Sequence, residues 1–179
     1  MVLPRFLYIQ TGGKAEMRFG KIKIDRKTLQ IAFFVILSIL AVIFIFSNSL
    51  QPGQKSAAQS RVVAKGIQKI VNSDAVGLTK KFHALIRKVA HIAEFAILGV
   101  GIGGLFFSIR MLNGKKYVSL PLLLGLTVGI CDEFIQYFGS RKSLVSDVLI
   151  DFGGVLLGML AISFVMILIN KIKNKRKNK

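Results

Sequence analysis

The sequence lacks several features on which familiar classes of enzyme and secreted domain depend. Its single cysteine, Cys131, allows no intramolecular disulfide and gives no information on the redox compartment. It has no Walker-type phosphate-binding loop, no CxxC pair and no GxSxG elbow, so nucleotide-binding, zinc-finger and hydrolase-elbow functions lack support. Acidic residues are also scarce, with 8 Asp and Glu against 26 Lys and Arg. The resulting net charge of +18 could suit a nucleic-acid binder. The bases flank apolar runs, however, so loop asymmetry in a membrane protein explains them better.

What the chain does contain is hydrophobic residues, which make up 53% of it and gather in long runs. The first run, 29–46, would span ~27 Å as a helix, close to the thickness of a bilayer core. It is longer than the apolar region of a signal peptide, and no A-x-A-like cleavage site follows it. We therefore predict an all-α, polytopic membrane protein with a bundle of four transmembrane helices. The other predicted helices cover 79–109, with its membrane part beginning near Lys88, then 118–138 and 148–170.

The chain outside the spans is polar and basic. Residues 1–28 are predicted to form a basic cytoplasmic lead, which fits a disordered segment and in which Met17 is an alternative start. Residues 29–170 form the membrane domain, and 171–179 a basic cytoplasmic tail. The long loop 47–88 has apolar and basic residues at roughly helical spacing. An amphipathic helix on the membrane surface and a solvated helix packed over the bundle both fit this loop.

The distribution of basic residues predicts the orientation of the chain. Four spans place both termini on one side of the membrane. The lead, the 110–117 loop and the tail together carry 16 Lys and Arg, whereas the 47–88 and 139–147 loops carry 10. By the positive-inside rule the termini are cytoplasmic and the latter two loops face outward.

Small residues recur within the spans at a spacing that lets helices approach closely. This pattern favours packing within the bundle over any dimer, and the sequence gives no oligomeric state. The pairs are Gly99 and Gly103, Gly125 and Gly129, and Gly154 and Gly158.

Polar residues fall on one face of each of three spans, near their predicted outward ends. Charged groups inside a membrane segment are costly and normally face a protein interior or a watery cavity. We therefore expect a shared polar pocket that opens outward. Ion pairs that merely hold the helices together, made by Arg87, Lys88, Arg141 and Lys142, are the structural alternative. The polar residues are Arg87, His91 and Glu94 in the second span, Asp132, Glu133 and Gln136 in the third, and Asp147 and Asp151 in the fourth.

Four stretches resemble the VanZ-like family. They are Phe-Ser-Asn-Ser-Leu-Gln-Pro-Gly (46–53), Arg-Lys-Val-Ala-His-Ile-Ala-Glu-Phe (87–95), Asp-Glu-Phe-Ile-Gln (132–136), and Arg141 followed by Asp-Val-Leu-Ile-Asp-Phe-Gly-Gly (147–154). The resemblance covers about residues 30–165, and the family often has a tyrosine where Phe95 stands. It implies a multi-pass protein of a bacterial, Gram-positive plasma membrane. The family takes its name from a protein that confers resistance to teicoplanin, a glycopeptide that binds cell-wall precursors. Its members have been suggested to act on lipid head groups or lipid-linked wall precursors.

On an enzymatic interpretation, the substrate is a phospholipid or a lipid-linked saccharide, and the chemistry takes place at a phosphate. Glu133 and His91 are then the acid/base candidates, and Glu94 and Gln136 complete the catalytic set. Asp132, Asp147 and Asp151 could bind a divalent cation through oxygen ligands. The phosphate would be held by Arg87, Lys88 and Arg141.

Two other interpretations remain. A non-catalytic accessory protein would bind a glycopeptide, a wall precursor or a partner protein at the outer face and alter antibiotic access. A transporter would have few spans for that role and shows no broken-helix repeat. The lipid bilayer is the expected partner of the chain on each of these interpretations. None of them requires nucleic acid.

The enzymatic interpretation predicts that Glu133→Gln abolishes lipid turnover and leaves the protein folded. Comparative lipidomics that includes wall precursors, with teicoplanin susceptibility scored in the same strains, measures this. Unchanged profiles in both a knockout and an overexpressor would contradict an enzyme. In an accessory protein, charge-preserving changes at Glu133 and Asp147 would keep the resistance phenotype.

Overall fold

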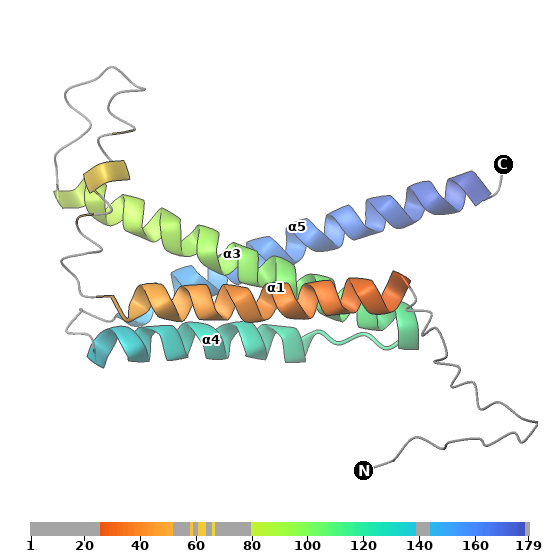
Figure 1. Ribbon diagram of the computed structural model, residues 1–179, viewed down its shortest axis with the longest axis horizontal. Helices are drawn as coiled ribbons and strands as arrows, with labels where there is room; N and C mark the ends of the chain where they lie inside the picture. Colours follow the sequence, from red (N-terminus) through yellow and green to blue (C-terminus); the bar gives the residue numbers. More distant parts are fainter. Residues whose placement is uncertain are drawn as a thin grey trace, which may run out of the picture.

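A computed structural model describes residues 26–51, 58, 61–63, 66, 80–138 and 144–177. These residues contain four long helices, and none of them forms a strand (Figure 1). All four helices are long and apolar enough to cross a membrane, which confirms the predicted all-α, multi-pass architecture. The helices are α1 (Arg26–Ser49), α3 (Lys80–Asn113), α4 (Ser119–Phe138) and α5 (Val145–Lys177).

Three of the four described helices, α1, α3 and α5, continue past the predicted ends of their spans, because local signals as well as the loss of hydrophobicity set helix ends. α3 runs through Arg110 to Asn113, past the predicted end at 109, and Gly114 then takes a left-handed conformation with φ 72°. The Gly114 N–H donates to the Arg110 carbonyl over 2.8 Å, which is a helix C-cap that glycine adopts without steric strain. α5 continues past the predicted end at 170 to Lys177, and the bases of its last turns suit a helix C-terminus.

α1 continues to Ser49 instead of ending at Phe46. The Leu50 N–H still donates to the Phe46 carbonyl over 3.0 Å, and Pro52 then disfavours further helix. In the predicted surface helix of loop 47–88, the described residues 61–63 and 66 are helical and exposed. The rest of that loop from 52 to 79 lies outside the described residues, apart from the helical Ala58.

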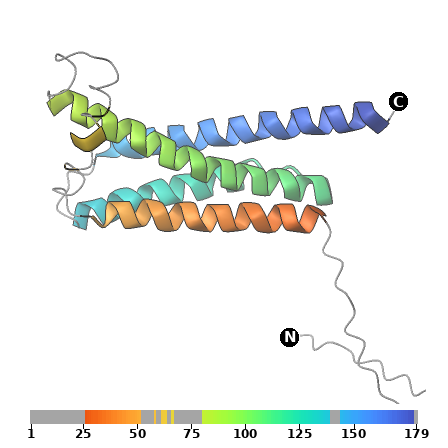
Figure 2. The ribbon, with the colours of Figure 1, turned by 45° about the horizontal axis from the view of Figure 1, so that its top comes forward.

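Successive helices run in opposite directions (Figures 1 and 2). The C-terminal ends of α1 and α4 and the N-terminal ends of α3 and α5 therefore lie together at one end of the bundle. α3 makes extensive contacts with both α1 and α5. This arrangement places polar residues from four different helices at the same end.

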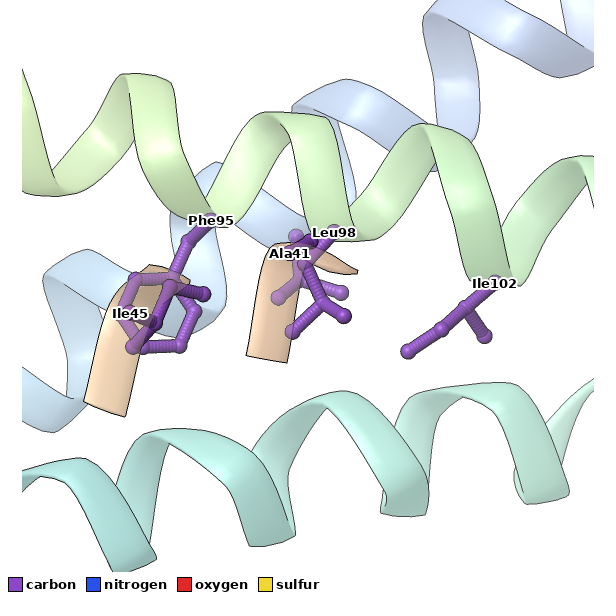
Figure 3. Packing of buried hydrophobic residues seen from close by; sticks show 6 residues of the cluster. Ala41, Ile45, Phe95, Leu98 and Ile102 are labelled. Carbon is purple, nitrogen blue, oxygen red and sulfur yellow. The ribbon is translucent and has the colours of Figure 1, made fainter. Parts of the chain in front are cut away.

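The hydrophobic core lies along the contact between α1 and α3 (Figure 3). Ala41 and Ile45 of α1 pack against Phe95, Leu98 and Ile102 of α3. Many large apolar side chains on the other helix faces are exposed, as is expected of a surface that contacts lipid. Val155 of α5 completes the buried cluster.

Glycines allow α5 to approach α3 and α4 closely. A Cβ atom added at Gly154 would lie 2.7 Å from the Ile92 carbonyl oxygen, and one added at Gly158 would overlap the Ala96 carbonyl. Gly99 faces the Val155 backbone in the same way. The glycine pairs therefore lie at contacts between helices within the bundle, as the sequence predicted.

Gly158→Ala is expected to destabilise the protein, because the new methyl group would meet the backbone of α3, which cannot move aside cheaply. The change should lower the free energy of unfolding by about 1–3 kcal/mol. Titration of the detergent-solubilised protein with SDS, followed by circular dichroism, measures it. Gly153→Ala is the matched control, because nothing lies within 4 Å of a Cβ there and alanine favours a helix. Equal destabilisation by both changes would contradict the close crossing.

Candidate functional site

Three ionisable side chains from three helices meet at the shared end of the bundle. The His91 Nδ1 atom of α3 lies 3.5 Å from Oδ1 of Asp151 on α5 and 3.9 Å from Oδ2 of Asp132 on α4. One ligand atom from each of the three lies within 4.8 Å of the others. Both carboxylates are buried, and the His91 side chain is 27% exposed. We call these three residues the His–Asp–Asp group.

The Asp132 carboxylate accepts hydrogen bonds at both of its oxygens. Ser49, at the end of α1, donates its hydroxyl to Oδ1. Gln136, one turn along α4, donates its amide to Oδ2 over 2.7 Å. These two donors are themselves buried, so they hold Asp132 in one orientation without help from solvent.

Asp151 differs from Asp132 in how its oxygens are satisfied. The residue is 1% exposed, and its Oδ1 faces His91. Its other oxygen, Oδ2, is buried and has no hydrogen-bond partner among the residues that the structure describes. A buried acceptor without a donor costs about 1–3 kcal/mol, and more when it is charged. Asp151 therefore has one oxygen that remains to be satisfied.

Two further contacts surround the group. Glu94, one turn after His91 on α3, accepts a hydrogen bond at Oε1 from the Asn48 amide of α1 over 2.9 Å. The imidazole ring of His91 stacks on the fully buried ring of Phe95, with the planes 16° apart and the centroids separated by 6.5 Å. The face of the imidazole is thus fixed by an apolar neighbour and its edge by carboxylates.

The contribution of α1 is the part of the site that was not predicted from the sequence. The first predicted helix ends at residue 46, whereas Ser-Asn-Ser at 47–49 forms the last helical turn of α1. Asn48 and Ser49 therefore point donors at Glu94 and Asp132. The sequence signal that could have indicated this contribution of α1 was the Phe-Ser-Asn-Ser stretch, which is part of the family resemblance.

Asp147 and Arg87, two further predicted site residues within the described ranges, are not members of the His–Asp–Asp group. Asp147, a predicted cation ligand, lies 3.9 Å from Lys88 in a partly exposed ion pair of the kind that contributes little to stability. The sequence predicted Asp147 as the third side chain beside Asp132 and Asp151, and the structure has His91 in that position. Arg87 is exposed and makes no ion pair with any residue of the described ranges. Arg141 lies outside the described residues.

Glu133, the first acid/base candidate from the sequence, is buried at the junction of α4 and α5. Its Oε2 accepts a hydrogen bond of 3.3 Å from the Leu144 N–H, directly before α5. A carboxylate at a helix N-terminus satisfies a backbone donor and interacts favourably with the helix dipole. This contact gives Glu133 a part in fixing the start of α5, on which Asp151 lies.

The His–Asp–Asp group suits two kinds of chemistry. An imidazole that faces carboxylates can exchange a proton with a bound molecule, since the carboxylates stabilise its charged form. The same three side chains supply the nitrogen and oxygen atoms that bind divalent metals.

A comparison with protein families matches residues 34–168 to the family described as VanZ/LLP1. This match covers α1 from Phe34 onward, all of α3 and α4, and most of α5, and so includes every residue of the site. The comparisons with curated proteins and with solved structures give no match.

Ser49→Ala is expected to destabilise the protein by about 1 kcal/mol, because it removes a donor from the buried Asp132 carboxylate. Unfolding in SDS, measured as for the glycine variants, gives the difference. Ser146→Ala serves as the control, because Ser146 is exposed and its side chain makes a hydrogen bond of 3.4 Å to the neighbouring Asp147 rather than to a buried group. Unchanged stability in Ser49→Ala would show that Asp132 does not need this donor.

Proposed function

The chain belongs to the VanZ/LLP1 family, and from this premise we propose that it is a bacterial plasma-membrane enzyme that acts on lipid head groups. The substrate class is a phospholipid or a lipid-linked cell-wall precursor. A change in the wall precursors or in the lipids that carry them would reduce the action of glycopeptides such as teicoplanin.

The observation that carries this proposal is the convergence of His91, Asp132 and Asp151 from three helices. Burying two carboxylates at the depth of a membrane is expensive, and interhelical polar contacts contribute only about 0.6–2 kcal/mol each. Stability alone is therefore a weak reason to keep such a group. His91 is the member of the group that is partly exposed, so it is the one that a substrate can reach.

The level of the group along the helices supports a head group as the substrate. Asp151 lies six residues from the start of α5, and Asp132 lies six residues from the end of α4, which is ~9 Å along each helix. A hydrocarbon core is ~30 Å thick, so the group lies near one surface of the bilayer rather than at its midplane. The phosphate and the glycerol or sugar atoms of a lipid lie at that depth of the bilayer.

The charges around the group suggest how a head group is held. Lys88 is half exposed beside Asp147. It lies on α3 one turn before His91, toward the N-terminal end of the helix. An ammonium group in that position can bind a phosphate oxygen, while His91 exchanges a proton with the attacking or departing oxygen. Asp132 and Asp151 stabilise the charged imidazole during that exchange.

The orientation that we propose turns the site outward. The basic residues at the N-terminal end of α1 and the C-terminal end of α5 lie at the opposite end of the bundle from the His–Asp–Asp group (Figure 1). The positive-inside rule places those bases in the cytoplasm. The group would then face the leaflet in which wall precursors are used.

His91→Gln is expected to reduce head-group turnover by about 10²-fold or more, because it removes the group that exchanges the proton. Lipid and wall-precursor profiles of a knockout, complemented with each variant at equal expression, measure the effect. Gly153→Ala, on the same helix as Asp151, is the control and should keep the wild-type profile, because nothing lies within 4 Å of a Cβ added there.

Glu133→Gln belongs in the same experiment, because an amide oxygen can still accept the Leu144 N–H. A loss of turnover in Glu133→Gln with none in His91→Gln would move the proton exchange to Glu133. Profiles that are the same in the knockout, the wild type and every variant, with teicoplanin susceptibility still changed, would favour the accessory protein over the enzyme.

Cysteine labelling tests the orientation. In a Cys131→Ser background, Ser146→Cys should react with a membrane-impermeant maleimide in intact cells, because Ser146 is exposed at the proposed outer end. Lys175→Cys, in the last turns of α5, should react only after permeabilisation. The reverse pattern would place the site on the cytoplasmic side.

A further inference from the structure

We propose that the His–Asp–Asp group binds one divalent transition-metal ion, with His91, Asp132 and Asp151 as its protein ligands. The three residues come from α3, α4 and α5, so the ion would join three helices. This assignment does not depend on the lipid substrate proposed above.

The distances suit a metal. Ligand atoms around zinc or manganese stand about 3–3.5 Å apart, since each bond is ~2.0–2.2 Å long. His91 Nδ1 and Asp151 Oδ1 already have that separation, at 3.5 Å. His91 Nδ1 and Asp132 Oδ2 are 3.9 Å apart, and all three ligand atoms lie within 4.8 Å. Side-chain shifts of about 1 Å or less would complete the coordination.

The buried Asp151 Oδ2 is a second and independent indication of a ligand. It has no hydrogen-bond partner among the described residues, although the residue is 1% exposed and belongs to the group. Asp132 and Glu94, by contrast, each receive side-chain donors from α1. A cation bound by Asp151 would satisfy the carboxylate oxygen that the described part of the chain leaves without a partner.

The balance of charge around the group also favours a cation. Within the described ranges, His91 is the sole basic side chain that pairs with Asp132 or Asp151, and Lys88 pairs with Asp147 instead. Glu94 adds a third carboxylate one turn along α3. A divalent ion would neutralise two buried carboxylates that otherwise repel each other.

The ligand set points to the class of metal. Imidazole is a common ligand of zinc and other transition metals, whereas magnesium and calcium favour sites built of oxygen alone. One imidazole and two carboxylates therefore fit Zn²⁺ or Mn²⁺. Ser49 and Gln136 would orient the Asp132 ligand from outside, as outer-shell donors do in metal sites.

Three protein ligands leave further coordination positions open, which is the arrangement of catalytic metal sites. A phosphate oxygen of a head group could take one of them, and this step alone rests on the proposed function. If the ion binds Nδ1 of His91, the proton exchange proposed above for His91 would pass to Glu94, one turn along α3. Its carboxylate is half-buried and held by Asn48.

Metal binding by the purified full chain tests the proposal. The protein is stripped with a chelator in detergent, dialysed against Zn²⁺ or Mn²⁺ alone, and assayed for bound metal by mass spectrometry. We expect one ion per chain. Asp151→Asn and His91→Gln should weaken binding by more than the ~10- to 100-fold typical of losing an outer-shell partner.

Asp147→Asn is the matched control, since it removes an acidic group from the same helix one turn away. Its affinity should stay within about twofold of wild type, because Asp147 lies outside the group. Absence of saturable binding of both ions by the wild type would overturn the proposal, as would an equal loss in Asp147→Asn. Neither result would bear on lipid turnover, which the profiles of the complemented knockout measure separately.

A second measurement is made on the folded wild type, so its result does not depend on the folding of a variant. Pulsed electron paramagnetic resonance of bound Mn²⁺ should show coupling to one imidazole nitrogen. The chain has 2 histidines, so the coupling should persist in His83→Gln and vanish in His91→Gln. No nitrogen coupling in the wild type, or coupling that survives in His91→Gln, would show that the group is not the site.

Discussion

The burial of Asp132 and Asp151 at membrane depth is the constraint on which the rest of the structure depends. Each carboxylate must be given donors or a cation by the protein, because lipid offers neither. Asp132 receives its donors from Ser49 and Gln136, and Asp151 faces His91. The glycine contacts also help to satisfy the buried carboxylates. Gly154 packs on Ile92, beside His91, and lies three residues after Asp151, so the close crossing of α3 and α5 also brings the imidazole to the carboxylate.

The site therefore joins all four helices. α1 supplies neutral donors, α3 supplies the imidazole and Glu94, and α4 and α5 supply the two buried carboxylates. A bundle that needed only stability could fill the same volume with apolar side chains at lower cost. The Oδ2 atom of Asp151 has no hydrogen-bond partner among the described residues, and a role in binding is the simplest explanation. A head group that approaches from the bilayer surface and an ion held between helices are compatible, since three protein ligands leave room for a substrate oxygen.

Much of the fold was predictable from the sequence, because hydrophobic runs of about bilayer length have few alternatives to helices in a membrane. The shared level of the polar residues was predictable too, since helical rise and alternating direction fix it. Three details were not. The ends of α3 and α1 depend on Gly114 and on polar residues that serve equally in turns and in last helical turns. The donors from α1 were missed for that reason. The third detail is that His91, and not Asp147, lies beside Asp132 and Asp151. Membership of the group depends on the neighbour that each side chain contacts, and the angular position of a residue on its helix does not determine that neighbour.

The central claim is that the His–Asp–Asp group is kept for function at a cost in stability. The free energy of unfolding of metal-free Asp151→Asn, measured in SDS against metal-free wild type, tests it most directly. Because the change removes one of two buried charges, our account predicts a variant that is equally or more stable than wild type. A variant destabilised by about 3–5 kcal/mol, the loss typical of breaking a buried ion pair that holds a fold together, would contradict it.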